Sequence, residues 1–195
     1  MKKIVLIGGL WLFMICLVGC DSSSTTQASF KLDGLDNYDV SQTSDEVNDE
    51  IFIYRLVVEK EEYQVGQPVK IYAELEYTGE NEEITIYHAA SPFYFPIEEK
   101  VRGFDIGYGM DEPLISTTLK KGEPLREVYV KNAGYSDIDE DDYVSFIKRF
   151  LENDGFPSGF YVVSGYADFT IYSSENTAGK KDFRMEAQID FKVVE

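Results

Sequence analysis

The chain has 195 residues, which suits one domain with a tail and leaves little room for two full-size domains. Its 36 acidic and 18 basic side chains give a formal net charge of -18. This charge argues against unaided binding of nucleic acid, because phosphate groups would be repelled over most of the surface. Because 44% of the residues are hydrophobic and 14% aromatic, the composition also excludes a wholly disordered chain.

The first residues have the organisation of an export signal. Lys2 and Lys3 form a short positive region, and residues 4–18 form an apolar stretch of 15 residues. A membrane-spanning helix needs about 20 apolar residues, so this stretch is short for a span and typical of a signal peptide.

The apolar stretch ends in Leu17-Val18-Gly19-Cys20, which resembles the lipobox of bacterial lipoproteins. The resemblance implies removal of residues 1–19 and attachment of lipid to Cys20. The mature chain would then be anchored on the extracytoplasmic face of the cell membrane. An ordinary signal peptide or a short anchor with a chance cysteine is the alternative. With Cys16 removed and Cys20 lipidated, the mature protein would have no free thiol and no disulfide.

Residues 20–50 predict a flexible acidic linker. Residues 21–29 are small and polar, and residues 30–50 are rich in aspartate and glutamate with Lys31 as the one base. We expect disorder over this range. The alternative is a short docking segment made by its apolar residues, Phe30, Leu32, Leu35, Tyr38 and Val40.

Residues 51–195 predict one domain rich in strands. Apolar and polar residues alternate over 69–77, 161–171 and 183–193, as in strands with one buried face. Weaker candidates are 51–58, 83–88, 104–108, 114–119 and 125–131, with Gly- and Pro-containing turns between them. The pattern predicts an all-β, immunoglobulin-like antiparallel β-sandwich, with Tyr161 as a tyrosine corner.

One short inserted α-helix interrupts the strand pattern. Its apolar residues recur at helical spacing: Tyr143, Val144, Ile147, Phe150 and Leu151. Asp137 or Asp139 is the expected N-cap, and Gly155 and Pro157 are the expected stop signals.

Three turn motifs, at 66–69, 119–123 and 157–161, resemble the layout of immunoglobulin-like bacterial surface domains. They are loosely similar to the Bacillus-type intracellular proteinase inhibitor family over roughly residues 60–172. That resemblance implies an alternative function, inhibition of an envelope or secreted protease, with residues 103–113 as the reactive loop. Residues 87–96 also resemble a stretch of Gram-positive lipoproteins, a match that implies no function.

The sequence favours a protein that is not an enzyme and needs no cofactor or metal. His88 is the single histidine, and we expect it at a strand end in a hydrogen bond. The acidic run 137–142 is not an EF-hand loop, since Asp142 and Lys148 stand where glycine and glutamate are required. A looser calcium site and an acidic helix start are both open for this run. A carboxylate pair for glycoside hydrolysis is also open, because 36 acids offer many pairs.

Two aromatic segments, 91–96 and 103–110, are the candidate binding loops. Phe93, Tyr94, Phe95 and Tyr108 would form a binding face if they are exposed, whereas the phenylalanines could instead fill the core at strand ends. We expect a monomeric, lipid-anchored surface domain that recognises an envelope component or a protein partner without catalysis.

Overall fold

The computed structural model describes residues 32–172 and 179–195; the predicted signal peptide and Cys20 lie outside these residues. The elements in chain order are η1 (Leu35–Asn37), β1 (Ser44–Asp49), β2 (Phe52–Val58), β3 (Glu62–Gln64), β4 (Ile71–Tyr77), β5 (Glu83–His88), β6 (Phe93–Tyr94), β7 (Ile97–Glu99), β8 (Phe104–Ile106), β9 (Ile115–Lys120), β10 (Leu125–Val128), α1 (Asp141–Glu152), β11 (Gly159–Tyr172) and β12 (Lys180–Val194). Within the two described ranges, no helix has the length and apolar character to cross a membrane.

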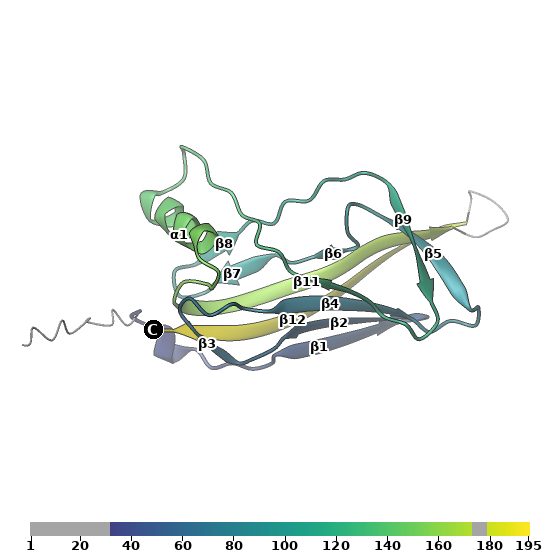
Figure 1. Ribbon diagram of the computed structural model, residues 1–195, viewed down its shortest axis with the longest axis horizontal. Helices are drawn as coiled ribbons and strands as arrows, with labels where there is room; N and C mark the ends of the chain where they lie inside the picture. Colours follow the sequence, from purple (N-terminus) through teal and green to yellow (C-terminus); the bar gives the residue numbers. More distant parts are fainter. Residues whose placement is uncertain (1–31, 173–178) are drawn as a thin grey trace, which may run out of the picture.

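The strands form two sheets that are largely antiparallel. The four-stranded sheet has the order β1-β2-β4-β10. The eight-stranded sheet has the order β3-β12-β11-β5-β9, with β6 and β7 also paired to β11 and β8 paired to β7. Only the short β3 runs parallel to its neighbour β12 among these named strands. The long β11–β12 hairpin runs the length of the molecule, and α1 lies at one end (Figure 1).

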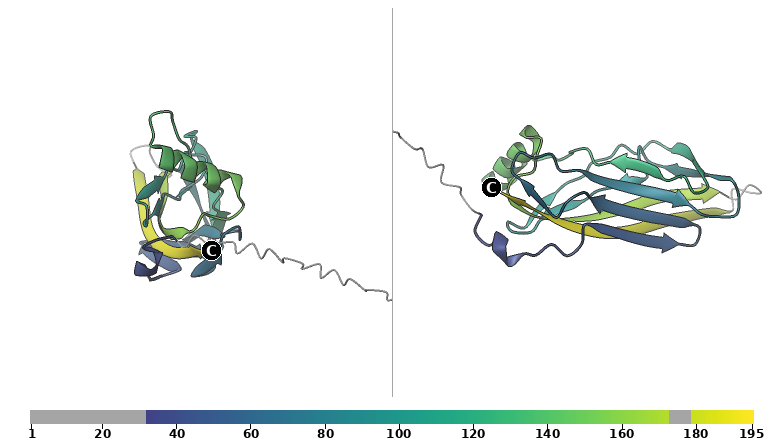
Figure 2. Two further views of the ribbon diagram at one scale, coloured as in Figure 1. Left: turned by 90° about the vertical axis from the view of Figure 1, so that its left-hand side faces the viewer. Right: turned by 60° about the horizontal axis from the view of Figure 1, so that its bottom comes forward.

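The two sheets pack on each other through their apolar faces (Figure 2). The ring of Phe52 on β2 lies 4.8 Å from that of Phe169 on β11 and 5.0 Å from that of Phe183 on β12. A Cβ atom on Gly165 of β11 would lie 2.9 Å from Leu56 Cδ2 of β2, so a larger residue here would push against the facing sheet. Alternating residues of both sheets thus build one shared core.

The prediction of an all-β domain with one inserted helix is confirmed at the level of a mostly β chain with two largely antiparallel sheets. The three strongest strand predictions correspond to β4, β11 and β12, and the weaker ones to β2, β5, β8, β9 and β10. Strands β1, β3, β6 and β7 were not predicted, because each is either short or rich in charged residues. The immunoglobulin-like sandwich topology stays a prediction.

Helix α1 confirms the predicted helix but not its N-cap. Glu140 occupies the N-cap position without a side-chain hydrogen bond, so Asp137 and Asp139 as caps are wrong. The carboxylate of Asp139 instead accepts hydrogen bonds from the backbone N–H and the hydroxyl of Ser136, at 2.5 and 2.9 Å. An alternative local hydrogen bond has therefore replaced the expected cap.

The C-terminal end of α1 is held by a lysine from the loop after β10. Lys131 Nζ donates hydrogen bonds to the carbonyl oxygens of Phe150, Asn153 and Gly155, at 2.7, 2.7 and 2.5 Å. It also lies 5.0 Å from the ring of Phe156. Lys131 thereby ties α1 to the sheets. The helix dipole offsets only part of the cost of burying its ammonium group, because burial lowers the pKa of Lys131 to about 8.

The expectation of a flexible linker up to residue 50 is wrong for residues 32–50, which the structure places on the domain. Leu35 is buried, and the ring of Tyr38 stacks on that of Phe160 at 5.0 Å. Further along, Asp190 of β12 accepts a hydrogen bond from the backbone N–H of Ser41 at 2.7 Å. The docking segment, which was the alternative, therefore describes this range better, and the domain boundary at residue 51 is too late.

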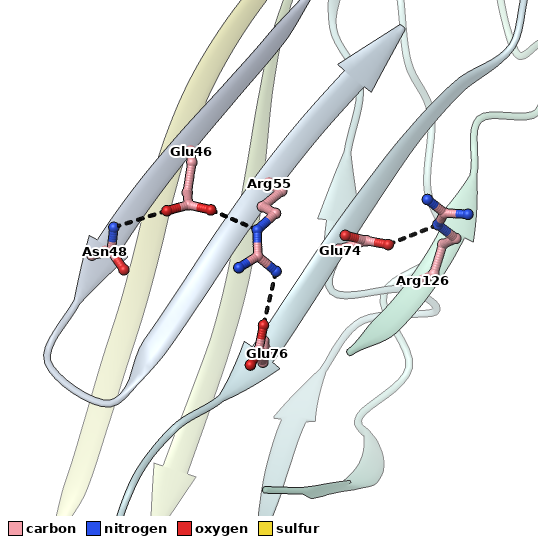
Figure 3. Close-up of polar contacts among 6 residues, drawn as sticks. All are labelled: Glu46, Asn48, Arg55, Glu74, Glu76 and Arg126. Atoms are coloured by element: carbon pink, nitrogen blue, oxygen red, sulfur yellow. Dashed lines mark hydrogen bonds and ion pairs between the residues drawn. The ribbon is translucent and has the colours of Figure 1, made fainter. Parts of the chain in front are cut away.

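Strand β1 adds to the edge of the four-stranded sheet by pairing with β2. On the outer face of this sheet, Glu46, Arg55 and Glu76 form a row of ion pairs across β1, β2 and β4, with distances of 2.6 and 2.8 Å (Figure 3). Arg126 of β10 pairs with Glu74 of β4 at 2.8 Å. Backbone pairing and these charges hold β1, since none of its side chains is fully buried.

Candidate binding groove

The outer face of the eight-stranded sheet, turned away from the four-stranded sheet, carries a depression of about 380 Å³. It lies over β6, β7, β8 and β11 and the segment after β8. We call it the tyrosine groove, and it is defined by six side chains: Tyr94, Glu98, Asp105, Tyr108, Ser164 and Tyr166. Strands β6 and β7, which contribute to its lining, pair with β11 on the side away from β12 (Figure 1).

The tyrosines of the groove are held in a rigid stack. Tyr94 and Tyr166 are direct cross-strand neighbours, and their rings stack 4.7 Å apart at an interplanar angle of 9°. The guanidinium of Arg184 covers the ring of Tyr166 at 3.9 Å. The ring of Tyr108 meets Tyr94 at 6.4 Å and Phe95 at 5.9 Å. Rings fixed in this way present contact area to a ligand with little further loss of conformational freedom.

The four predicted binding residues divide between the two faces of the sheet. Phe93 and Phe95 are 0% and 2% exposed, so an exposed binding role is wrong for both, and they fill the core. Alternation along a strand sends the intervening Tyr94 to the opposite, outer face. Tyr94 and Tyr108 are half-buried and line the groove, where their predicted binding role stays a prediction.

Two carboxylates face each other at the far end of the groove. Glu98 on β7 and Asp105 on β8 are direct cross-strand neighbours. Like charges in this position destabilise a sheet. Lys100 Nζ offsets one of them by binding both carboxylate oxygens of Glu98, at 2.8 and 2.9 Å. Asp105 is exposed and lines the groove.

The surroundings of the groove raise the pKa values of two of its tyrosines, Tyr94 and Tyr108. Burial raises the pKa of Tyr94, and the neighbouring Tyr166, Asp168 and Glu112 raise it further. Burial likewise raises the pKa of Tyr108, with a further contribution from Glu127. Arg184 acts in the opposite direction and lowers the pKa of Tyr94. The lining of the groove contains two carboxylates, Glu98 and Asp105, and no basic side chain, so it favours hydrogen-bond donors and cations over anions.

A buried carboxylate beneath the groove positions its strands. Glu99 on β7 is 0% exposed and accepts hydrogen bonds from the backbone N–H groups of Val101, Arg102 and Phe160, at 3.1, 2.9 and 3.2 Å. It also pairs with the Arg102 guanidinium at 3.2 Å. Glu99 thereby joins the β7–β8 turn to the start of β11.

The other predicted sites do not join the groove. His88 ends β5, where its Nδ1 donates to the Ala89 carbonyl and its Nε2 accepts from the Thr117 hydroxyl, both at 2.8 Å, as expected for a strand-end histidine. Both ring nitrogens of His88 are therefore occupied. Across the described residues, including the run 137–142, no three His, Cys, Asp or Glu side chains are grouped so that they could hold a metal ion.

Sequence reasoning missed Tyr166, Glu98 and Ser164, and it included Asp105 only as a member of the candidate loop 103–110 without assigning it a role. A signal for Tyr166 was present, because it is an aromatic residue on the face of 161–171 that the alternation assigned to solvent. No comparable signal marks Glu98 and Asp105, which meet only through the pairing of β7 with β8.

No protein-family model, curated protein or solved structure matches this chain. The assignment of function therefore depends on the geometry and chemistry of the groove.

Proposed function

We propose that the chain is a non-catalytic binding domain, anchored by lipid on Cys20 at the outer face of a cell membrane. It recognises an envelope component or a protein partner through the tyrosine groove. The observation that carries this proposal is the stack of Tyr94 on Tyr166, capped by Arg184 and flanked by Tyr108, at the rim of a concave surface. Aromatic side chains fixed at a concave surface with a few polar groups are characteristic of ligand-binding sites.

The opposed carboxylates of Glu98 and Asp105 support the same assignment. Their proximity opposes folding, and a ligand that donates hydrogen bonds or carries positive charge would relieve it. Lys100 binds both carboxylate oxygens of Glu98, which favours a binding role over proton transfer for this carboxylate.

We further propose that the two sheets form an immunoglobulin-like β-sandwich. The hydroxyl of buried Tyr161 donates a 2.6 Å hydrogen bond to the Pro157 carbonyl four residues upstream. A tyrosine near a strand start that bonds back to the preceding backbone is typical of this architecture and supports the prediction of a tyrosine corner.

Metabolic labelling of a bacterial host with palmitate tests the anchor. The wild-type chain should take up label and sediment with membranes, and Cys20→Ser should do neither, since the acyl chains supply the membrane affinity. Equal labelling of both proteins would contradict the lipid anchor.

Co-sedimentation of the full-length protein with insoluble cell-envelope material tests the groove. Tyr94→Ala and the surface change Asp105→Lys should each lower the bound fraction. Tyr72→Ala is the matched control, because Tyr72 is a half-buried tyrosine under Arg126, 3.7 Å away, on the outer face of the other sheet. Equal retention of all four proteins would contradict binding at the groove. An unchanged melting temperature for Asp105→Lys would exclude misfolding as the cause of lost binding.

A second candidate function, inhibition of an envelope or secreted protease, is supported by the segment 107–114. This segment has no regular structure and is largely exposed, with Leu114 77% exposed. Its backbone is fixed by a 3.1 Å hydrogen bond from Ala90 N–H to the Asp111 carbonyl and by a bond from the Asn132 amide to the Gly109 carbonyl. Screening the protein against secreted proteases tests this function, and inhibition lost in Leu114→Asp would support it.

A further inference from the structure

A second depression continues the tyrosine groove along β11. It has a volume of about 270 Å³ and includes Tyr87, Glu112, Asp168 and Thr170 in its lining. Tyr94 lines both depressions and forms the ridge between them. The two hollows are thus neighbouring parts of one surface on the outer face of the sheet.

This surface follows the outer side chains of a single strand. Ser164, Tyr166, Asp168 and Thr170 alternate along β11 and line one or the other depression. At about 3.3 Å per residue, the distance from Ser164 to Thr170 is roughly 20 Å. A single small ring would occupy only one hollow, whereas an extended chain would contact both.

An extended peptide could bind a sheet by adding a strand, but β11 has no free edge for it. Its backbone pairs with β12 on one side and with β5, β6 and β7 on the other. Strand addition requires an unpaired edge, so a ligand on this face is recognised without adding a strand to β11.

The side chains on this surface select the chemistry of that ligand. Asp105 and Glu112 offer exposed carboxylates, which accept hydrogen bonds and donate none when ionised, and Asp168 adds a third that is paired with Arg184 at 3.7 Å. The tyrosine rings add flat apolar area. The hydroxyl of Thr170 already donates to Asp182 at 2.6 Å and that of Ser164 already accepts from the Gln188 amide at 3.0 Å, so the carboxylates are the main polar groups open to a ligand. A matching ligand is rich in hydroxyl groups, has apolar ring faces and carries no negative charge.

Resting on the proposed binding function, we infer that the ligand is a linear glycan of neutral or amine-bearing sugars that lies along β11 across both depressions. Sugar hydroxyls, and amino groups where present, donate to the carboxylates, while the rings lie against Tyr94 and its neighbours. The two depressions are lined by the carboxylates of Glu98, Asp105, Glu112 and Asp168 and by no lysine or arginine, which disfavours phosphorylated, sulfated or otherwise anionic polymers.

Titration calorimetry of the full-length protein with defined oligosaccharides tests this inference. The probes are cello-oligosaccharides and chito-oligosaccharides of two to six sugars, the latter with and without N-acetyl groups. Affinity for at least one series should rise with chain length. Tyr94→Ala should lower that affinity about tenfold, as for the loss of an anchoring aromatic residue, and Tyr72→Ala should leave it unchanged.

Further probes distinguish a neutral glycan from an anionic polymer and from a basic peptide. Dextran sulfate should not bind, and its binding at the groove would overturn the inference. An oligolysine that binds in a Tyr94-dependent manner while every sugar series fails would overturn it in favour of a basic peptide. If all sugar series fail but envelope co-sedimentation still depends on Tyr94, the glycan is wrong and the proposed binding function stands. Release of shorter oligosaccharides would instead contradict the non-catalytic assignment.

Discussion

Replacement of Glu99 by glutamine should destabilise the part of the fold that carries the tyrosine groove. The two carboxylate oxygens of Glu99 share four donors. Oε1 accepts from the N–H groups of Val101 and Phe160, and Oε2 accepts from the N–H of Arg102 and pairs with its guanidinium. In glutamine one of the two oxygens becomes an NH₂ group, which itself donates. Two of the four donors therefore lose their acceptor in a site with no access to solvent.

The magnitude follows from these contacts. A hydrogen bond to a charged group contributes about 1.5–3 kcal/mol, and breaking a buried ion pair costs about 3–5 kcal/mol. Arg102 lowers the expected effect, because its side chain is 22% exposed and also donates to the Ser158 carbonyl at 2.9 Å. We expect Glu99→Gln to reduce the free energy of unfolding by about 3 kcal/mol. For a chain of this length that corresponds to a decrease in melting temperature of about 6–12 °C.

Thermal unfolding followed by circular dichroism measures this effect, with the adjacent Glu98→Gln as control. Glu98 and Lys100 are 39% and 38% exposed, so their ion pair contributes little to stability. A melting temperature of Glu99→Gln equal to that of Glu98→Gln would refute the reasoning. If the melting temperature of Glu99→Gln does fall, comparing the double variant Glu99→Gln/Arg102→Met with each single variant shows whether the carboxylate acts through the guanidinium or through the backbone N–H groups.

Three further perturbations test other parts of the fold. Asp190→Ala should lower the free energy of unfolding by about 2 kcal/mol and speed hydrogen exchange in β1, because it removes the acceptor for Ser41. Unchanged exchange in β1 would contradict the role of Asp190 in holding residues 32–50 on the domain. Tyr161→Phe should lower the free energy of unfolding by about 1–2 kcal/mol in urea titrations, since it leaves the Pro157 carbonyl without its donor, and an effect near zero would count against the corner. Burial lowers the pKa of Lys131 from 10.5 to about 8, so between pH 8 and 10.5 the unfolded chain binds more protons than the folded chain. The free energy of unfolding of the wild type, relative to that of Lys131→Met, should therefore rise as the pH increases over this range. A fall over this range would show that the fold favours the ammonium form.

Much of the fold could be read from the periodicity of the sequence. The rows of alternating residues at 69–77, 161–171 and 183–193 are strands because each has one apolar face that must be buried, and no tertiary information is needed to recognise them. Helix α1 was recognisable from apolar residues at helical spacing, among them Ile147 and Phe150, which are buried. The buried face also includes Phe146, which the prediction left out, and excludes Leu151, which is exposed. The N-cap of α1 was not recognisable, because Asp139 had a competing partner in Ser136.

Strand β1 shows why the acidic segment 32–50 was misjudged. Its composition lacks the apolar mass that drives folding of an isolated segment. Its stability comes from partners far along the chain: Asp190 binds Ser41, and β2 supplies both backbone pairing and Arg55 for Glu46. A local window of sequence contains none of these contacts.

The sequence by itself determined that this protein is a β-rich chain with one helix, because hydrophobic periodicity is a local property of the residues. It also placed Tyr94 within a candidate binding loop. Only the tertiary structure decided that Tyr94 faces outward while Phe93 and Phe95 face the core, and that Tyr166, Glu98 and Asp105 join it. The physical reason is that a groove on a sheet is made by cross-strand neighbours. Which residues become neighbours depends on strand pairing and register, and these are fixed by the burial of the whole core.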